Sequence, residues 1–374
     1  MKKVLIVFGT RPEAIKMAPV VHAFRARSDR FDTRVCVTGQ HREILDQVLS
    51  FFDIHPDYDL NIMKPGQDLN QLTAAVILAM APVLDEFQPD LLFVHGDTTT
   101  SAICALAGYY AGVKVCHVEA GLRTRDIYSP FPEELNRQLT ARIASLHFAP
   151  TVHAKANLVA EGINAEQVFI TGNTIIDALN YATGKVDTVE TPELQQLKSY
   201  LGNKAPLILV TCHRRENFGA GLESICSALK RIAESHDIQL IYPVHPNPNI
   251  SSVVRAKLDA TRNIHLIKPL SYPAFIWLMK NCKFIITDSG GIQEEGNALG
   301  KQVLLLRSNT ERPEVLGAGG VQLVGTDSEA IVSSAEVLLN NPMRNSLHHF
   351  PYGNGHAAAD ILSITIQEYV QAVP

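Results

Sequence analysis

The segment from Cys116 to Arg137, CHVEAGLRTRDIYSPFPEELNR, gathers acidic side chains directly after an apolar run. No second histidine or cysteine stands close enough in the sequence to suggest a metal site. Two uses of the acids remain open. Glu119 or Glu133 only pairs with an arginine of the segment, or the acids transfer protons in a closed site, where grouped carboxylates raise one another's pKa. The acids are Glu119, Asp126, Glu133 and Glu134, and the arginines are Arg123, Arg125 and Arg137.

Histidines follow several apolar runs, each within a polar motif. They are His95 in HGDTTT, His117 in HVEAGLR, His213 in HRREN and His245 in HPNPN. A single such histidine is most often a structural partner of backbone carbonyls. Four at predicted strand ends favour a shared polar site, although they do not establish catalysis.

Two glycine-containing turns could bind an anion. In FGTRPEAIK, Gly9 ends the first predicted strand, and Arg11 and Lys16 bring positive charge to the start of a predicted helix. A helix N-terminus offers unpaired N–H groups to a phosphate. The alternative is a plain strand-to-helix turn with Pro12 at the start of the helix.

The second turn, TDSGGIQEE, opens another predicted helix with Ser289, Gly290 and Gly291. Glycines let backbone N–H groups approach a phosphate closely, and Glu295 could accept hydrogen bonds from a ribose. The alternative is a glycine-rich turn with an acid that favours the helix start. Together with Arg312 in TERPE, the turn predicts a nucleoside diphosphate site.

Short apolar runs alternate with amphipathic segments along the chain, and this pattern predicts parallel strands covered by helices. The predicted fold is therefore α/β, with two Rossmann-like, doubly wound domains that position the residues named above. We expect an N-terminal domain over 1–181, a polar linker over 182–205 and a C-terminal domain over 206–356. A helix over 357–374 would belong to either domain and could pack back on the first. Two such domains would face a cleft, and ligands of open α/β sheets bind beyond the carboxyl ends of the strands.

The composition limits the partners. The 374 residues are 46% hydrophobic and 19% charged, with a net charge of −5 and no long basic run, which argues against nucleic acid and anionic membranes. The apolar run at the N-terminus is too short for a signal peptide, and no membrane span is expected. The six scattered cysteines predict buried, reduced thiols. No G-x-G-x-x-G follows the first predicted strand, and no Walker or H-E-x-x-H motif occurs.

In their order along the chain, the motifs resemble the non-hydrolysing UDP-N-acetylglucosamine 2-epimerases of bacteria. The resemblance covers nearly the whole chain and rests on the joint occurrence of its motifs. They are VLIVFGTRPEAIKMAPV, QHREILDQVL, DYDLNIMKPGQ, HGDTTT, HVEAGLRT, YSPFPEE, FITGNTIIDAL, HRREN, DSGGIQEE, TERPE and FPYGNGHAA.

This resemblance implies a glycosyltransferase-B fold and a cytoplasmic homodimer that interconverts UDP-N-acetylglucosamine and UDP-N-acetylmannosamine without a nicotinamide cofactor or a metal. Some members also bind a second, allosteric substrate molecule. The implied catalytic residues are Asp97, Glu119, Glu133 and His213. The implied substrate and UDP-binding residues are Arg11, Lys16, His213, Phe275, Ser289, Gly290, Gly291, Glu295 and Arg312. The implied allosteric residues are Gln40, His41, Glu43, Arg214 or Arg215, and His245.

The chain departs from the common family pattern in EEGNALGKQVLLLRSNTERPE, which leaves the substituents of the sugar open. The departures are Gly296, Asn297, Ala298, Gln302, Ser308 and Asn309, with Leu270 where some members have glutamine. The alternatives are an epimerase of a related UDP-2-acetamido sugar, a hydrolysing epimerase, a glycosyltransferase of the same fold and a non-catalytic sensor of UDP-sugars.

Overall fold

The chain folds into two compact units in this computed structural model, which describes residues 1–39, 42–64, 66–200, 205–310, 312–317, 319–340 and 351–369. Unit 1 comprises Met1–Ala178 and Tyr352–Pro374, and unit 2 comprises Leu179–Pro351. Both are parallel α/β sheets with helices, which confirms the predicted fold class. Among the described helices, none has the length and apolar character that crossing a membrane requires.

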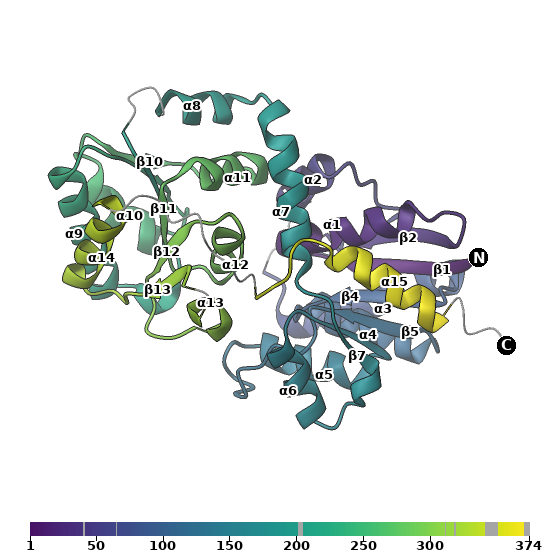
Figure 1. Cartoon of the computed structure of the whole chain (residues 1–374). Helices are drawn as coiled ribbons and strands as arrows, with labels where there is room; N and C mark the ends of the chain where they lie inside the picture. Colours follow the sequence, from purple (N-terminus) through teal and green to yellow (C-terminus); the bar gives the residue numbers. More distant parts are fainter. Residues whose placement is uncertain are drawn as a thin grey trace. The chain divides into compact units, whose positions relative to one another are not determined.

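Unit 1 is built on a seven-stranded parallel sheet in the order β3-β2-β1-β4-β5-β6-β7. Figure 1 labels β1, β2, β4, β5 and β7 of this sheet. The strand order reverses at β1 and β4, which pair directly. The strands are β1 (Lys2–Phe8), β2 (Phe31–Val37), β3 (Tyr58–Asp59), β4 (Leu91–His95), β5 (Lys114–Val118), β6 (Leu146–Ala149) and β7 (Val168–Ile170).

The helices of unit 1 form two packed groups. One group contains α3, α4 and α5, and the other contains α1, α2 and the last helix, α15 (Figure 1). Right-handed crossovers on either side of β1 and β4 require the two groups to cover opposite faces of the sheet. The helices are α1 (Arg11–Arg25), α2 (Arg42–Phe51), α3 (Leu69–Phe87), α4 (Thr99–Tyr110), α5 (Glu133–Ile143), α6 (Val152–Ala160), η1 (Ala165–Gln167), α7 (Thr174–Lys185) and α15 (Ala357–Tyr369), of which α7 runs on into unit 2.

The helix starts of unit 1 follow local capping rules. Thr10 caps α1 in a capping box with Glu13, and a proline lies in the first turn. Asp68 caps α3 in a second capping box with Gln71. The start of α15 is held by Asp177 of α7, whose carboxylate accepts the N–H groups of Ala357 at 3.2 Å and Ala358 at 2.9 Å.

Unit 2 contains a six-stranded parallel sheet in the order β10-β9-β8-β11-β12-β13, with its reversal at β8 and β11. Its strands are β8 (Leu207–Thr211), β9 (Gln239–Pro243), β10 (Ile264–Ile267), β11 (Phe284–Thr287), β12 (Gln302–Leu305) and β13 (Val321–Leu323). Its helices are η2 (Val186–Thr188), α8 (Pro192–Tyr200), η4 (Arg215–Asn217), α9 (Ala220–Ser235), α10 (Pro248–Leu258), α11 (Tyr272–Asn281), α12 (Gly290–Ala298), α13 (Pro313–Gly317) and α14 (Ser328–Asn340).

Both sheets are buried on the two faces, as near-continuous apolar strands require. All six cysteines are buried, which confirms their predicted place in the core. Burial raises the pKa of the Cys36 thiol to about 12, so this side chain behaves as a small apolar group.

Candidate active site

The loops after β1 and β4 meet where the strand order of unit 1 reverses. Gly9 fits there because it lacks a side chain: a Cβ would lie 2.1 Å from Thr38 Oγ1 and 2.7 Å from Thr100 Oγ1. The buried carboxylate of Glu13 accepts the N–H groups of Gly9 at 3.1 Å and Thr10 at 2.8 Å. It also accepts the hydroxyl of Thr98 at 2.6 Å, which ties the start of α1 to the start of α4.

Glu119 directly follows β5 and lies in this region with its backbone in the left-handed conformation, at φ 61°. A non-glycine residue rarely adopts this conformation, and such strain is concentrated at functional sites. Its Oε2 is ion-paired with the ammonium of Lys16 and accepts the side-chain amide of Asn173 at 2.7 Å. The structure thus brings together two of the expected site residues, Lys16 and Glu119.

His95, the last residue of β4, borders the same carboxylate. Its Nε2 lies 3.8 Å from Glu119 Oε2 and makes no hydrogen bond to the described residues. Burial lowers the pKa of His95, and this outweighs the attraction of Glu119, which acts in the opposite direction. A buried neutral imidazole carries no charge, so it is Lys16 rather than His95 that supplies positive charge beside Glu119.

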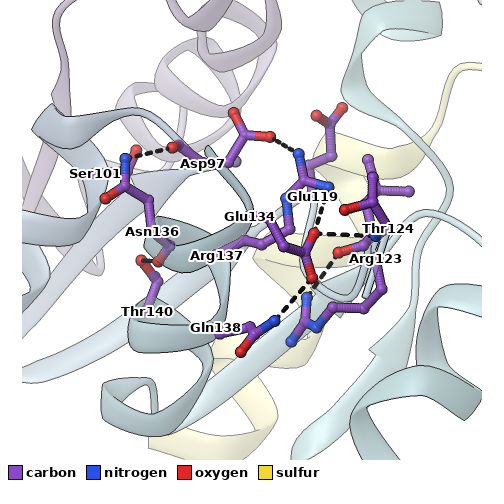
Figure 2. Close-up of polar contacts among 12 residues, drawn as sticks. Asp97, Ser101, Glu119, Arg123, Thr124, Glu134, Asn136, Arg137, Gln138 and Thr140 are labelled. Carbon is purple, nitrogen blue, oxygen red and sulfur yellow. Dashed lines mark hydrogen bonds and ion pairs between the residues drawn. The ribbon is translucent and has the colours of Figure 1, made fainter. Parts of the chain in front are cut away.

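Asp97 lies on the adjoining loop, two residues beyond the end of β4. Its carboxylate pairs with Arg137 of α5, and Asn136 donates its side-chain amide to the Asp97 carbonyl at 3.0 Å. Figure 2 shows the polar contacts running from Asp97 through Arg137 to Glu134. Gly96, on the same loop, lies close to Glu119: a Cβ added to Gly96 would be 3.7 Å from Glu119 Oε1.

Glu134, one of the four acids of the segment from Cys116 to Arg137, has a structural role. It is fully buried and accepts the N–H groups of Thr124 at 3.0 Å and Arg125 at 3.3 Å, the Gln138 amide at 2.8 Å and Arg137 Nη1 at 3.2 Å (Figure 2). Burial alone would raise the pKa of Glu134, but the hydrogen bonds and Arg137 lower it overall. This acid is therefore held as a carboxylate.

Glu133, the preceding residue, is in a different environment. It begins α5 and is half-buried, and its Oε2 is shielded from solvent without a hydrogen-bond partner among the described residues. Two of the three arginines of the segment pair with other acids: Arg123 forms a bidentate pair with Glu161 at 2.7 and 2.9 Å, and Arg137 pairs with Asp97 and Glu134.

His117 contacts the backbone of the loop that follows β4. It is fully buried on β5, and its Nε2 lies 2.7 Å from the carbonyl oxygen of Gly96. Burial is the main cause that lowers the pKa of His117 to about 3, with a further contribution from His147 beside it on β6. His147 is also buried, and its pKa is lowered to about 4 by burial and then by Arg123. Of the four predicted strand-end histidines, His117 is thus a neutral core residue.

The corresponding position in unit 2 is where β8 and β11 pair and the strand order reverses. His213 follows β8, and Asp288 follows β11. The side chain of Asp288 is fully buried and lies 3.7 Å from His213 Nδ1. The His213 ring stacks with that of His245, with centroids 6.0 Å apart.

The SGG turn lies at the same edge of the unit 2 sheet. Ser289 is the N-cap of α12 and makes no side-chain capping bond, so the first N–H groups of the helix lack that partner. Arg312 reaches α12 through an ion pair of 2.5 Å between its Nε and Glu294 Oε1. Glu295 is buried one turn into the helix. The predicted nucleotide residues Ser289, Gly290, Gly291, Glu295 and Arg312 therefore lie on or beside one helix.

The remaining expected residues are placed as follows. Arg11 is exposed at the start of α1, and Phe275 is half-buried on α11. Arg214 donates its backbone N–H to Asp288 at 2.8 Å, and His245 Nδ1 accepts the N–H of Asn247 at 3.1 Å. Gln40 and His41 lie outside the described residues, and Glu43 lies on α2, where its side chain is not described.

Gly296, one of the departures from the family pattern, faces the sheet. A Cβ there would lie 2.8 Å from Val303 Cγ2 and 3.2 Å from Ile285 Cδ1. This departure therefore concerns the packing of α12. In the part of the chain that the structure describes, no group of three or more His, Cys, Asp or Glu residues is arranged to hold a metal ion.

Sequence reasoning missed Asn173 and Asp288. Asn173 follows β7 in FITGN, and Asp288 separates FIIT from SGG, so both are polar residues at the carboxyl end of a strand. This position is the signal that could have identified them.

Known proteins resemble the chain over almost its full length. The sequence profile of the family described as UDP-N-acetylglucosamine 2-epimerase matches residues 22–365. A protein of Yersinia pestis named UDP-N-acetylglucosamine 2-epimerase is 52% identical over 368 residues, which are 96% of this chain and 97% of that protein.

Solved structures also resemble the chain over almost its full length. The UDP-GlcNAc 2-epimerase of Neisseria meningitidis, solved bound to UDP-GlcNAc, gives a TM-score of 0.90 at 44% identity and covers 98% of this chain and 100% of its own. The enzyme of Methanocaldococcus jannaschii, in complex with UDP-GlcNAc and UDP, gives a TM-score of 0.82 at 33% identity with the same coverage.

Proposed function

Because the chain belongs to the UDP-N-acetylglucosamine 2-epimerase family, we propose that it reversibly inverts C2 of UDP-N-acetylglucosamine to give UDP-N-acetylmannosamine. The supporting observation is the Glu119 site. A strained carboxylate with a side chain only 9% exposed lies at a strand end, where Lys16 and Asn173 hold it, and the adjoining loop carries a second acid, Asp97. Acids in such an arrangement suit the removal and return of a proton.

The chemistry follows from the substrate. No carbonyl carbon adjoins C2, so its hydrogen is not acidic until the ring is activated. Transient oxidation at C3 would need a nicotinamide, and the chain lacks the G-x-G-x-x-G fingerprint after its first strand. In the proposed route the C1–O bond breaks, and its electron pair leaves on the β-phosphate oxygen of UDP. A carboxylate removes the C2 proton, which gives a 2-acetamidoglucal and UDP.

The reverse addition of UDP and a proton to the glycal determines how many acids are needed. A second acid delivers its proton to C2 from the opposite face of the ring, and the β-phosphate oxygen bonds to C1 again. The proton held by the first acid then passes to the second through solvent after product release, which restores the starting protonation. One acid must remove the proton and another must supply it, and we propose that Asp97, Glu119 and Glu133 share these tasks. Glu134 is not included because its carboxylate is saturated by four donors within its own unit.

The nucleotide is proposed to bind unit 2. The N-terminus of α12 offers N–H groups and partial positive charge to a diphosphate. His213 lies at the same reversal of strand order, and Glu295 could accept hydrogen bonds from the ribose. Stabilising the leaving diphosphate supplies the electrostatic part of catalysis.

The wider setting rests on the family resemblance alone. We propose that the chain acts in the cytoplasm as a homodimer and supplies a precursor of a surface polysaccharide. We also propose that a second substrate molecule activates it through Arg214, His245 and the segment around Glu43.

The experiment is incubation of the purified chain with UDP-N-acetylglucosamine in D₂O, without added cofactor, while C2 is followed by NMR. Deuterium at C2 together with the manno isomer is the expected result. No exchange, or exchange that depends on added NAD, would refute the elimination route. Exchange only in a related UDP-2-acetamido sugar would identify that sugar as the substrate instead. Release of free N-acetylmannosamine would identify a hydrolysing epimerase, and dependence on an acceptor would identify a glycosyltransferase.

A further inference from the structure

Asp288 is a fully buried carboxylate at the carboxyl end of β11, immediately before the turn that begins α12. Its Oδ2 accepts the backbone N–H groups of His213 at 2.9 Å and Arg214 at 2.8 Å, and the side-chain amide of Asn217 at 3.1 Å. One oxygen of Asp288 therefore fixes the backbone that carries His213.

The second oxygen is unsatisfied. Asp288 Oδ1 is shielded from solvent and makes no hydrogen bond within the described part of the chain. It lies 3.7 Å from His213 Nδ1, which is ion-pair range and slightly too long for a hydrogen bond. A buried carboxylate oxygen without a donor is unfavourable, and catalytic hydrogen bonds are often long until a ligand is present.

The two side chains differ in access to solvent. The His213 side chain is 45% exposed, whereas that of Asp288 is not exposed at all. A ligand can therefore approach the imidazole, while the carboxylate can act on that ligand only through the ring. Among the described residues, the charged or titratable groups around His213 include Asp288 from the β11–α12 turn, His245 from the loop after β9, the flanking Arg214 and the buried thiol of Cys212.

We propose that Asp288 is a positioning residue for His213. It accepts a hydrogen bond from Nδ1–H, fixes the ring so that Nε2–H is directed at a phosphate oxygen of UDP, and keeps the ring doubly protonated. This inference rests on the proposed function because it takes UDP as the ligand. An imidazolium between two anions has an acceptor for each N–H group, and both hydrogen bonds are charge-assisted.

The consequence for the reaction is electrostatic. As the C1–O bond breaks, negative charge grows on the β-phosphate oxygen, and the imidazolium faces that charge. The proton stays on Nε2, so no transfer through His213 is required. Preorganised positive charge at a leaving oxygen costs no reorganisation during the step.

The test is Asp288→Asn in the full chain. Oδ2 receives three donors, so the asparagine oxygen must take that position and its NH₂ group must face His213 Nδ1. Nδ1 then has to accept rather than donate, and the ring becomes neutral with its proton on Nε2. We expect UDP to bind roughly 10- to 100-fold more weakly by calorimetry, the loss of one charge-assisted contact.

The spectroscopic signature is specific. In the UDP complex, ¹⁵N NMR of His213 should show two protonated ring nitrogens in the parent protein and one in Asp288→Asn. Asn217→Ala is the matched control, because it removes a donor to the same carboxylate without neutralising it. It should lower the unfolding temperature, leave the ring protonation of His213 unchanged and keep the affinity for UDP within about threefold.

A double-mutant cycle separates a positioning role from a merely structural one. With His213→Gln as background, Asp288→Asn should weaken UDP binding no further. A neutral His213 in the parent complex, or independent losses in the cycle, would overturn the inference. If Asp288→Asn does not fold, the parent spectrum alone decides. Failure of the parent protein to bind UDP would instead refute the proposed function.

Discussion

Lys16 and Glu119 are 103 positions apart in the sequence and form an ion pair at the carboxyl edge of the unit 1 sheet. Their side chains are only 11% and 9% exposed, so water screens the pair weakly. A cation beside a carboxylate favours its charged form. The pair therefore stabilises the charged form of Glu119 and fixes the position of its carboxylate at the strand end.

Replacing Glu119 with glutamine should lower kcat by about 10²–10⁴-fold, since one group for proton transfer is lost while the shape is kept. Deuterium incorporation at C2 measures the effect, and circular dichroism checks the fold. Glu166→Gln, at an exposed site in η1, is the control and should retain full activity. Unchanged exchange in Glu119→Gln would remove this residue from the mechanism.

Replacing Lys16 with methionine should destabilise unit 1 by about 3–5 kcal/mol, because the Glu119 carboxylate would be left without its cation. Urea unfolding measures the loss. The double variant Lys16→Met, Glu119→Gln should recover most of it, since neither member of the pair then carries a charge. Equal stability of the single and double variants would show that the two side chains are not coupled.

His147 should make the protein sensitive to acid. Its folded-state pKa of about 4 lies below the ordinary value of about 6.5. Between these values the unfolded chain binds a proton that the folded chain does not, so stability is full above about pH 6.5 and falls as the pH falls toward 4. At pH 5 the loss relative to pH 7 is about 2 kcal/mol.

His147→Leu should remove this part of the pH dependence, as measured by urea unfolding at pH 7 and pH 5 with each protein compared with itself. The control is His153→Leu, which replaces an exposed histidine of α6. An undiminished pH slope in His147→Leu would show that the acid sensitivity arises elsewhere.

Gly9→Ala tests the close approach at the first strand end. The new methyl would overlap the hydroxyls of Thr38 and Thr100, which lie 3.0 Å apart, and overpacking of this kind costs about 1–3 kcal/mol. Gly184→Ala is the matched variant in α7, where nothing lies within 4 Å of the new Cβ. There, thermal unfolding should show a gain of about 0.5–1 kcal/mol, the helical preference of alanine over glycine.

The sequence predicts the fold class because alternating apolar strands and amphipathic helices have few other solutions. It also indicates Lys16, which lies near the start of a predicted helix, and Glu119, which directly follows a predicted strand. It could not separate Glu133 from Glu134. Successive residues on a helix point about 100° apart, so their environments depend on where α5 begins, and the proline-rich turn before it does not determine that residue.

The residues that a buried side chain contacts in the folded chain could not be predicted from the sequence either. The buried neighbours of His117 and Asp288 come from segments distant in the sequence, such as His147 on the next strand and Asn217, 71 positions away. A single sequence shows a polar residue at a strand end but not the direction in which its side chain points.

Unit 1 is discontinuous in the chain, and its last segment ends in α15, which packs against α1. Protein synthesis proceeds from the N-terminus, so every residue of unit 2 is added to the chain before α15 is made. The surface of α1 that α15 covers therefore stays uncovered until residues 357–369 have emerged from the ribosome. A ribosome that stalls near position 351 would expose that surface to chaperones and proteases.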